Sequence, residues 1–514
     1  MKSHYDVVII GSGLGGLVSA NILAKEGYSV CVLEKNNQYG GNLQTFVRDK
    51  TIFDTGVHYI GGLNEGQNLY QYFKYLDIID DLNLKKLDED GFDVVTFEGD
   101  DNEYKHAQGY DKFIKNLLIE FPDEEKAIIT YCDKLQDICN QFPLYGLKHG
   151  KPYYENTDIF SLKAKDYIDS ITDNKKLRAV LAGTNYLYAG DANRTPFYVH
   201  ALTVNSYIES AYRCVNGGSQ ISKLLIRRLK ENGGDAFKHH EVVKFGFEDK
   251  NISSVFTKNG KEIKGDLFIS NIEPKLTIKL VGEDKFRKVY TKRINNIESI
   301  IAGFSLYIVL KPNTFKYQNK NIYHIKDPNK IWDGQDYTTE TWPEGYMASM
   351  GINKKTDVYG ESLTVMTFMR YEEVEPWENT FNTVANKNER GQTYEEFKAE
   401  KAEKLIQELE KKYPNIRDCI QETYTSTPLS YRDYIGSNRG SIYGYVKDAN
   451  NPLASFVSPR TKIKNLLLTG QSLNMHGILG VTISAVLTCS EIIGMEPLLE
   501  KILDANKTDE SIEN

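Results

Sequence analysis

The first 41 residues carry the pattern that most constrains how this chain folds. An apolar run from Val7 to Ile10 leads directly into the glycine-rich turn GSGLGG at residues 11–16. A stretch suited to a helix follows, and then a second apolar run from Val30 to Leu33, which ends at Glu34. Strand, glycine turn, helix, strand and acid in this order are typical of a βαβ unit that binds an adenine dinucleotide.

Each glycine of the turn has a separate physical task in such a site. Gly11 permits the tight turn, Gly13 lets the backbone approach a pyrophosphate, and Gly16 lets the helix pack close to the strand. The helix N-terminus offers free N–H groups and a positive partial charge to the phosphates. Glu34 lies where an acid binds the ribose 2′-OH, so an unphosphorylated adenosine ribose is expected. A glycine-rich loop without a ligand is the competing interpretation, which the shared register of these features disfavours.

The residues that follow Glu34 favour FAD over NAD as the dinucleotide. A second glycine pair, Gly40-Gly41, comes shortly after the acid and is followed by Asn42. In large flavoproteins the chain continues into such a turn, where the backbone meets the rest of the FAD. Nicotinamide dehydrogenases usually lack it, so FAD is the expected cofactor.

Length and charge narrow the class of protein further. A chain of 514 residues is too long for one hydrophobic core, so two domains, interleaved in sequence, are expected. The net charge is −8, which argues against nucleic acid as a partner because phosphate contacts need clustered Lys and Arg. The six cysteines form no CxxC pair and have no zinc-like spacing, so buried free thiols in a reducing compartment and no metal site are expected.

The sequence also bears on location. No cationic and then apolar leader precedes the first strand, and no run of about 20 apolar residues exists. A cytoplasmic protein is therefore expected, with peripheral contact at a membrane surface left open. The oligomeric state is not predicted.

Turn and helix signals divide the chain into segments. Residues 67–83, 110–146, 163–170 and 175–190 have helical spacing. Asn216 to Ser219 are predicted to cap a helix from Gln220 to Asn232, and LLLTG at 466–470 is one more strand. The predicted fold class is α/β: a Rossmann-like FAD-binding domain assembled from separated segments, with an inserted α+β substrate domain and a helical cap. The expected boundaries are 1–84, 211–290 and 456–514 for the FAD-binding domain, 85–210 for the helical cap and substrate segment, and 291–455 for the sheet and helices of the substrate domain.

Three further segments carry a family resemblance. They are FDTGVHYIG at 53–61, STPLSYRDYIGSNRGSIYGY at 426–445 and LLLTGQSLNMHGILGVTISAV at 466–486. Together they resemble the phytoene desaturase, carotenoid isomerase and retinol saturase family of FAD enzymes, and look most like its retinol saturase branch. The resemblance covers nearly the whole chain, while residues 85–205 and 315–400 match only in general layout.

The resemblance implies roles for particular residues. Gln471 stands where many flavoproteins have an Asp that binds a ribityl or ribose hydroxyl, so this contact differs here. The helix from Gly477 would direct its N-terminus at the flavin N1–C2=O edge and stabilise the anionic reduced flavin. Val242 would contact the adenine through its backbone. The full set of residues expected at the cofactor is Gly11, Ser12, Gly13, Leu14, Gly15, Gly16, Glu34, Lys35, Gly40, Gly41, Asn42, Val57, Val242, Asn271, Gly470, Gln471, Gly477, Gly480 and Val481.

The chemistry implied is transfer of a hydride or electrons at the flavin N5 with movement of one proton. Four side chains are candidates for the proton transfer: His58, Tyr59, Tyr443 and His476. The family implies an apolar polyene substrate, a retinoid or carotenoid-like lipid, and a retinol saturase-like reductase is the leading interpretation. No second nucleotide fingerprint is present, so a reductase would need a separate electron donor: NAD(P)H, a quinone or a partner protein.

Other functions remain as alternatives at this stage. A carotenoid desaturase or isomerase would use the same site. An amine oxidase shares the layout of the FAD domain, but its usual Lys near the flavin and its aromatic cage cannot be located in the sequence. A non-catalytic FAD-binding protein is the alternative of a different class, and it would bind flavin without any flavin reduction or reoxidation by a polyene.

Overall fold

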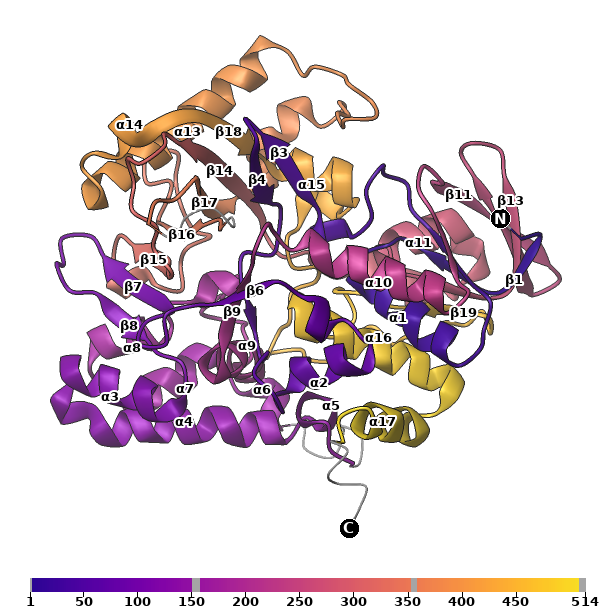
Figure 1. The fold of residues 1–514 in the computed structure, drawn as a ribbon, viewed down its shortest axis with the longest axis horizontal. Helices are drawn as coiled ribbons and strands as arrows, with labels where there is room; N and C mark the ends of the chain where they lie inside the picture. Colours follow the sequence, from indigo (N-terminus) through magenta and orange to yellow (C-terminus); the bar gives the residue numbers. More distant parts are fainter. Residues whose placement is uncertain (1, 150–157, 353–357, 508–514) are drawn as a thin grey trace.

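Two seven-stranded β-sheets organise the fold, and Figure 1 shows them on opposite sides of the molecule with helices between and beneath them. This computed structural model describes residues 2–149, 158–352 and 358–507. The first sheet has the strand order β10-β2-β1-β13-β12-β11, and β19 pairs with β13. Its strands are β1 (His4–Ile10), β2 (Val30–Leu33), β10 (Asp235–Phe237), β11 (Val242–Glu248), β12 (Asn251–Thr257), β13 (Glu262–Ser270) and β19 (Leu466–Leu468).

The centre of the first sheet is parallel, and helices cover both of its faces. β1 runs parallel to β2 and β13, while β11 and β12 extend the sheet in antiparallel fashion. Val7 and Ile9 pack into the cluster that contains α1 (Leu14–Lys25) and α16 (Gly477–Ile493), and the alternate residue Val8 packs into the cluster on the other face. Burial on both faces explains why the second half of β1, from Val7 to Ile10, and the whole of β2 are continuously apolar. A Rossmann-like domain assembled from separated segments of the chain is thus confirmed.

The second sheet has the order β18-β14-β17-β16-β15-β7-β8 and is antiparallel except where β15 pairs with β7. Two of its strands, at residues 93–97 and 104–106, come from the segment expected to form the helical cap, and all five residues of the first are buried. The strands are β7 (Asp93–Phe97), β8 (Tyr104–His106), β14 (Ala302–Leu310), β15 (Asn321–Ile325), β16 (Gly345–Met350), β17 (Ser362–Met369) and β18 (Ile420–Ser426).

A layer of helices lies beneath the second sheet in Figure 1 and forms the cap. Within it α4 packs along α9 and α3. The cap helices are α3 (Tyr110–Glu120), α4 (Glu125–Asn140), α5 (Pro143–Gly146), α6 (Asp158–Ser161), α7 (Ala164–Ile171), α8 (Lys175–Leu181) and α9 (Phe197–Glu209). The remaining α-helices are α2 (Asn68–Tyr75), α10 (Ser219–Glu231), α11 (Pro274–Val281), α12 (Lys288–Asn296), α13 (Gln392–Lys412), α14 (Ile416–Cys419), α15 (Pro428–Ile435) and α17 (Met495–Asp504).

Short strands connect the cap to the two sheets. β5 (Ile60–Gly61), β9 (Ala211–Cys214) and β6 (Leu84–Lys86) form one small sheet, and β3 (Thr45–Arg48) pairs with β4 (Thr51–Asp54) in a hairpin. β9 leads into α10, which begins at Ser219 with Gly218 as its N-cap residue and no side-chain cap. The N-cap residue thus lies within the segment Asn216 to Ser219 that was predicted to cap the helix, and the helix starts one residue before Gln220. The Gly218 N–H donates to Asp54 Oδ1 at 2.7 Å, which ties the helix start to β4.

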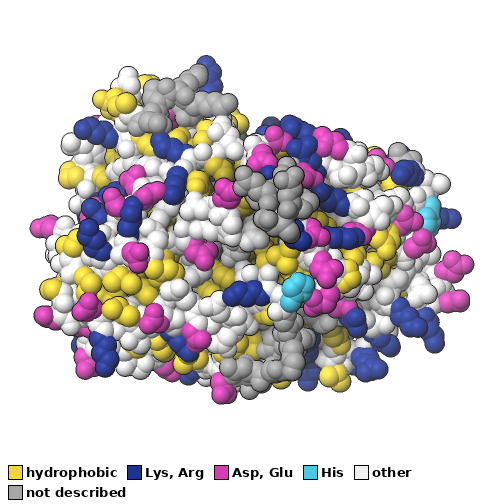
Figure 2. All heavy atoms as spheres, turned by 60° about the horizontal axis from the view of Figure 1, so that its bottom comes forward, with side chains coloured by type: hydrophobic (Ala, Val, Ile, Leu, Met, Phe, Trp, Pro, Cys, Tyr) yellow, Lys and Arg dark blue, Asp and Glu magenta, His cyan; other side chains and the backbone are white. Residues whose placement is uncertain are grey.

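The surface is mixed in charge. Figure 2 shows Lys and Arg side chains interspersed with Asp and Glu over the face seen from below. All six cysteines are buried free thiols, as expected. In the part of the chain that the structure describes, no helix combines the length and the apolar character needed to cross a membrane.

Candidate active site

One cavity of about 920 Å³ connects the glycine turn of the first sheet to a group of aromatic side chains under the second sheet. Its walls come from the first βαβ unit, the segment around β4 and β5, the cap helices α5, α6 and α9, the second sheet, and the start of α16. A cavity of this size is at the upper end of the range for small-molecule and cofactor sites. The segments that carried the sequence motifs therefore meet around one space.

The glycine turn has the geometry that its sequence predicted. Gly11 has a φ of 93°, which a side chain would strain. A Cβ on Gly16 would lie 2.3 Å from the Gly11 carbonyl oxygen, so only glycine permits this approach of α1 to the turn. Gly13 is the N-cap residue of α1, and no side chain caps the helix. The first N–H groups of α1 are thus left for a ligand.

Asn271 closes the other side of this turn. It follows β13, and its Nδ2 donates to the Gly11 carbonyl at 3.3 Å. A Cβ on Gly13 would lie 2.9 Å from Asn271 Nδ2, and one on Gly15 would lie 2.7 Å from Asn271 Oδ1. The glycines and Asn271 therefore form a cradle of bare backbone that a Cβ would fill. Such a cradle fits the pyrophosphate of a dinucleotide.

Glu34 lies at the end of β2, beside this cradle, and is 4% exposed. Its carboxylate accepts the Ser12 N–H at 3.1 Å and the Asn36 N–H at 2.8 Å, and the Ser12 hydroxyl also donates to it. The carboxylate is thus fixed at the cavity wall, where an acid binds the ribose hydroxyls of a bound adenosine. The next residue, Lys35, reaches across to the Asp433 carbonyl, and burial lowers the pKa of its ammonium.

The second glycine pair folds back onto the first. The Gly40 N–H donates to the Ser12 carbonyl at 3.1 Å, and a Cβ on Gly41 would lie 3.2 Å from Gly13 Cα. Asn42 Nδ2 then donates to Gln471 Oε1 at 3.4 Å, so the first and last motifs of the chain touch. Gln471 keeps an uncharged donor and acceptor at this position.

The structure brings nearly all the residues predicted at the cofactor to one cavity. Gly16 is the exception, since it lies behind the turn where the helix meets the strand. Those that line the cavity are Gly11, Ser12, Gly13, Leu14, Gly15, Glu34, Lys35, Gly40, Gly41, Asn42, Val57, Val242, Asn271, Gly470, Gln471, Gly477, Gly480 and Val481.

His476 and Tyr443 form a stacked pair in the cavity wall, with ring centroids 4.4 Å apart. His476 is the N-cap residue of α16, and its Nε2 is paired with the Leu187 carbonyl at 2.8 Å. Burial lowers the pKa of His476 to about 4. The Tyr443 hydroxyl donates to the Tyr186 carbonyl at 3.0 Å. Both side chains therefore hydrogen-bond to backbone carbonyls, and the His476 imidazole is uncharged at neutral pH.

His58 and Tyr59 line the same cavity from the segment before β5. Burial, and secondarily the charge of Arg213, lower the pKa of His58 to about 4, and its Nε2 is buried without a hydrogen-bond partner. Tyr59 is 4% exposed, and its ring packs against Tyr207 at 4.3 Å. Its hydroxyl donates to Asp93 Oδ2 at 2.7 Å. Of the four candidates for proton transfer, Tyr59 is thus the one whose hydroxyl contacts an acid.

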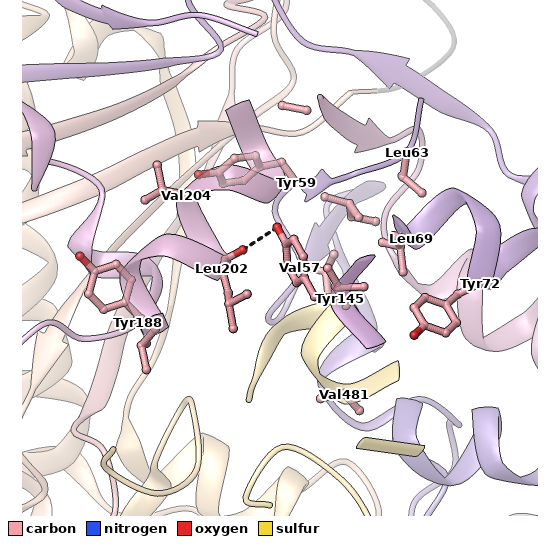
Figure 3. Close-up of a cluster of buried hydrophobic side chains, with 14 of the residues drawn as sticks. Val57, Tyr59, Leu63, Leu69, Tyr72, Tyr145, Tyr188, Leu202, Val204 and Val481 are labelled. Carbon is pink, nitrogen blue, oxygen red and sulfur yellow. Dashed lines mark hydrogen bonds between the residues drawn. The ribbon is translucent and has the colours of Figure 1, made fainter. Parts of the chain in front are cut away.

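Sequence reasoning missed the apolar end of the cavity. Figure 3 shows Val57 and Tyr59 facing Tyr145 of α5 and Leu202 of α9, with Val481 of α16 below them and the Tyr145 hydroxyl bonded to the Leu202 carbonyl at 3.0 Å. More aromatic and sulfur-containing side chains extend this wall. They are Phe142, Phe160, Tyr186, Tyr198, Tyr207, Tyr323, Met347, Met366 and Phe368. They come from segments without motifs, so the only sign of them in the sequence is its large number of tyrosines, 34 of 514 residues.

Lys447 also lines the cavity, at a position that the sequence analysis did not single out. Its ammonium donates to the carbonyls of Leu473 at 3.0 Å and Ser455 at 3.2 Å. Burial lowers the pKa of Lys447 to about 8. Lys447 lies two residues after the motif at 426–445, so its place next to that motif is the sequence signal that could have identified it.

Comparison with known proteins gives the geometry a context. A sequence model described as an NAD(P)-binding Rossmann-like domain matches residues 9–76. All-trans-retinol 13,14-reductase of Danio rerio is 28% identical, covering 95% of this chain and 86% of its own length. Prolycopene isomerase 1, chloroplastic, of an Oncidium hybrid cultivar is 25% identical, covering 98% of this chain and 86% of its own length. A solved structure of putrescine oxidase aligns with a TM-score of 0.63 at 14% identity over 95% of this chain and 99% of its own, which supports the fold alone.

The fold, the glycine cradle and these relatives define the class of protein: it is an FAD-dependent oxidoreductase. Within that class, the chain is similar over most of its length to retinol 13,14-reductases, prolycopene isomerases and a 4,4'-diaponeurosporene oxygenase. The resemblance noted from the three sequence motifs is thereby confirmed.

Proposed function

We propose that this protein reduces a carbon–carbon double bond of an apolar polyene such as a retinoid, in the manner of the retinol 13,14-reductases that it resembles. The observation that carries the proposal is the continuity of the cavity. One end is the bare-backbone cradle around Gly13 and Asn271, and the other is an aromatic wall around Tyr145 and Leu202. A flat, elongated and apolar molecule is complementary to that wall.

We infer that the residues lining the polar end hold FAD. The uncapped start of α1 would take the pyrophosphate, Glu34 the adenosine ribose, and the uncapped start of α16 the electron-rich edge of the flavin. Bound FAD supplies the transfer of a hydride to or from carbon. The domain boundaries expected from sequence are part of the same proposal.

The residues of the apolar end would bind and orient the substrate and exclude water. Tyr145 and Leu202 present ring and aliphatic surface from two different cap helices, so the cap fixes the position of the polyene along the cavity. Exclusion of water matters because it strengthens electrostatic interactions in the site. Since a polyene of this kind resides in lipid, peripheral contact with a membrane surface belongs to the proposal.

Anaerobic flavin spectroscopy tests this function directly. Photoreduced holoenzyme is mixed with all-trans-retinol, and oxidised holoenzyme is mixed with a carotenoid and, separately, with putrescine. Reoxidation of the flavin by retinol, with a dihydro product, is the expected result. Bleaching by putrescine alone would contradict the proposal, and a purified protein that neither contains nor takes up FAD would overturn the whole assignment.

Double-bond isomerisation is the second candidate, favoured by the similarity to prolycopene isomerase over 98% of this chain. It would use the same cavity without net oxidation or reduction. A change of polyene geometry with no lasting change in the flavin spectrum would select it. A reductase needs an external electron donor. NAD(P)H and a reduced quinone can be compared by the rate at which each bleaches the oxidised flavin.

A further inference from the structure

A buried carboxyl group lies directly behind the cavity wall at Tyr59. Asp93 is the first residue of β7 and is 1% exposed. Its Oδ2 accepts the Tyr59 hydroxyl at 2.7 Å, and its Oδ1 accepts Asn321 Nδ2 at 2.8 Å. The Tyr59 oxygen is also 2.6 Å from the hydroxyl of Tyr323, which lies on the neighbouring strand β15. Two tyrosines and one acid thus form a continuous hydrogen-bonded row.

The guanidinium of Arg213 does not contact this row directly. Arg213 of β9 donates Nη2–H to Asn321 Oδ1 at 2.6 Å, so an amide separates the guanidinium from the Asp93 carboxyl. Its Nη1 donates to the Tyr317 hydroxyl at 3.1 Å. A carboxyl group without a direct cation partner loses much of its solvation on burial and gains little in return.

The other groups that face Asp93 do not compete for its proton. Tyr207 of α9 packs on Tyr59, and burial raises the pKa of both phenols. His106 is the cross-strand neighbour on β8, but its Nε2 is paired with the Val180 carbonyl at 3.1 Å, and burial lowers its pKa to about 4. Burial raises the pKa of Asp93 to about 7, which the bonds from Asn321 and Tyr59 and the charge of Arg213 only partly offset.

We propose that Tyr59 is the group that protonates the substrate carbon, and that Asp93 supplies the replacement proton through their hydrogen bond. The proposal rests on the polyene reduction proposed above. Reduced flavin gives a hydride to one carbon of the double bond, and the electron pair of the π bond takes the Tyr59 proton at the other carbon. When Asp93 is protonated, its carboxyl O–H is the donor in the bond to the Tyr59 oxygen, which leaves the Tyr59 O–H free for the substrate. The Asp93 carboxyl proton then passes to the Tyr59 oxygen, so Tyr59 ends neutral and Asp93 ends as a carboxylate. A proton from solvent restores the acid before the next turnover.

The structure favours this pair over the two histidines of the cavity. His58 and His476 both have a pKa of about 4, so at neutral pH neither is an imidazolium that could act as a general acid. Tyr59, in contrast, lines the cavity and touches an acid that titrates near neutrality. Tyr59 is thus the catalytic residue of the proposal, and Asp93 acts through it.

The test uses holoenzyme variants Asp93→Asn, Asp93→Glu and Tyr59→Phe, with Tyr131→Phe as the matched control. Tyr131 is another fully buried tyrosine with a hydrogen-bonded hydroxyl, and it lies away from the cavity. Photoreduced enzyme is mixed with all-trans-retinol, and flavin reoxidation is followed across neutral pH. In the wild type the rate should fall as the pH rises through about 7. Asp93→Asn and Tyr59→Phe should be slower by ~10²-fold or more, Asp93→Asn should lose the pH dependence, and Asp93→Glu should regain part of the rate.

A second readout does not depend on turnover. Infrared difference spectra of the oxidised holoenzyme between mildly acid and mildly alkaline pH should contain the C=O bands of two buried protonated carboxyls, Asp54 and Asp93. Asp93→Asn should lack the Asp93 band and keep the Asp54 band. Absence of the Asp93 band in the wild type, or an Asp93→Asn variant with the wild-type rate and pH profile, overturns the proposal. If retinol does not reoxidise the wild-type enzyme although the Asp93 band is present, the proposed function is wrong, and the proton-transfer step that rests on it is wrong too. If the wild type is active and the variants are unaffected, only the proton-transfer step is refuted.

Discussion

At the scale of single residues, the polar side chains of the cavity wall differ in their hydrogen-bond partners, and these partners decide which side chain can transfer a proton. The His476 Nε2 is paired with the Leu187 carbonyl, and the ring stacks on Tyr443. Because burial keeps the imidazole neutral, this histidine holds the loop before α16 against the cap rather than moving a proton. Tyr59 has an acid behind it instead, which makes it the better proton donor.

His476→Phe tests this distinction. The variant keeps an aromatic ring on Tyr443 but leaves the Leu187 carbonyl unpaired, so we expect the free energy of unfolding to fall by about 1–3 kcal/mol. The pH dependence of flavin reoxidation should stay that of the wild type, because His476 is already neutral. Urea unfolding and the pH–rate profile measure the two effects. His4→Phe, at an exposed histidine, is the control and should change stability by about 0.5 kcal/mol or less.

At the scale of elements, the site depends on how closely helices approach strand ends. α1 begins against the turn that follows β1, and Gly16 is where the two meet. The cap contributes in a different way, because α5 and α9 supply the aromatic and aliphatic wall without any backbone approach to the glycine turn. Changes in the two regions should therefore separate cofactor binding from substrate binding.

Gly16→Ala should impair FAD binding. Its Cβ would overlap the Gly11 carbonyl oxygen at 2.3 Å, so α1 must shift, at a cost of about 1–3 kcal/mol in the free energy of unfolding. The flavin content of purified protein and the affinity of FAD-free protein for added FAD measure the effect. Gly91→Ala is the control, since there the nearest atoms belong to the flexible side chain of Lys105. Equal FAD content in both variants would contradict the packing role assigned to Gly16.

Leu202→Trp should impair substrate binding and leave FAD binding intact, the reverse of Gly16→Ala. The larger Trp side chain on α9 would fill the space opposite Tyr145. Retinol should therefore no longer reoxidise the photoreduced flavin, while the FAD content stays unchanged. Ile119→Trp, on an exposed position of α3, is the matched substitution in the same cap and should leave both properties as they are. Wild-type kinetics in Leu202→Trp would exclude this end of the cavity as the substrate site.

At the scale of the whole molecule, buried titratable groups set how stability depends on pH. Five histidines have a pKa of about 3 to 4 in the folded chain, below the ordinary value of 6.5: His58, His106, His200, His324 and His476. The unfolded chain binds their protons first, so each of them costs stability as the pH falls from 6.5 towards 4. Asp54 and Asp93, whose pKa burial raises to about 7, act in the opposite sense.

Burial also raises the pKa of Glu209 and Glu273, which act in the same sense as the two aspartates. We expect the five histidines to dominate, because the unfolded chain protonates all of them between neutral and mildly acid pH, so the melting temperature should fall over that range. Asp93→Asn removes one of the opposing groups, so its loss of stability on acidification should be steeper than that of the wild type. Thermal unfolding of the holoenzyme at several pH values measures both slopes. A melting temperature that rises on acidification would contradict the burial of these histidines.

The sequence by itself determined the parts of this protein that depend on neighbours along the chain. A βαβ unit is local, so the order of apolar runs, glycines and Glu34 was enough to predict the cradle, and separate motifs such as the one ending at Gly470-Gln471 were recognisable one by one. Only the tertiary structure decided what those motifs enclose. Tyr59 meets Asp93, 34 positions away, and Tyr323, 264 positions away, because β7 from the cap segment pairs in parallel with β15 of the second sheet. Pairing between strands so distant in the chain leaves no local pattern, since it is the shared burial of both strands that selects it.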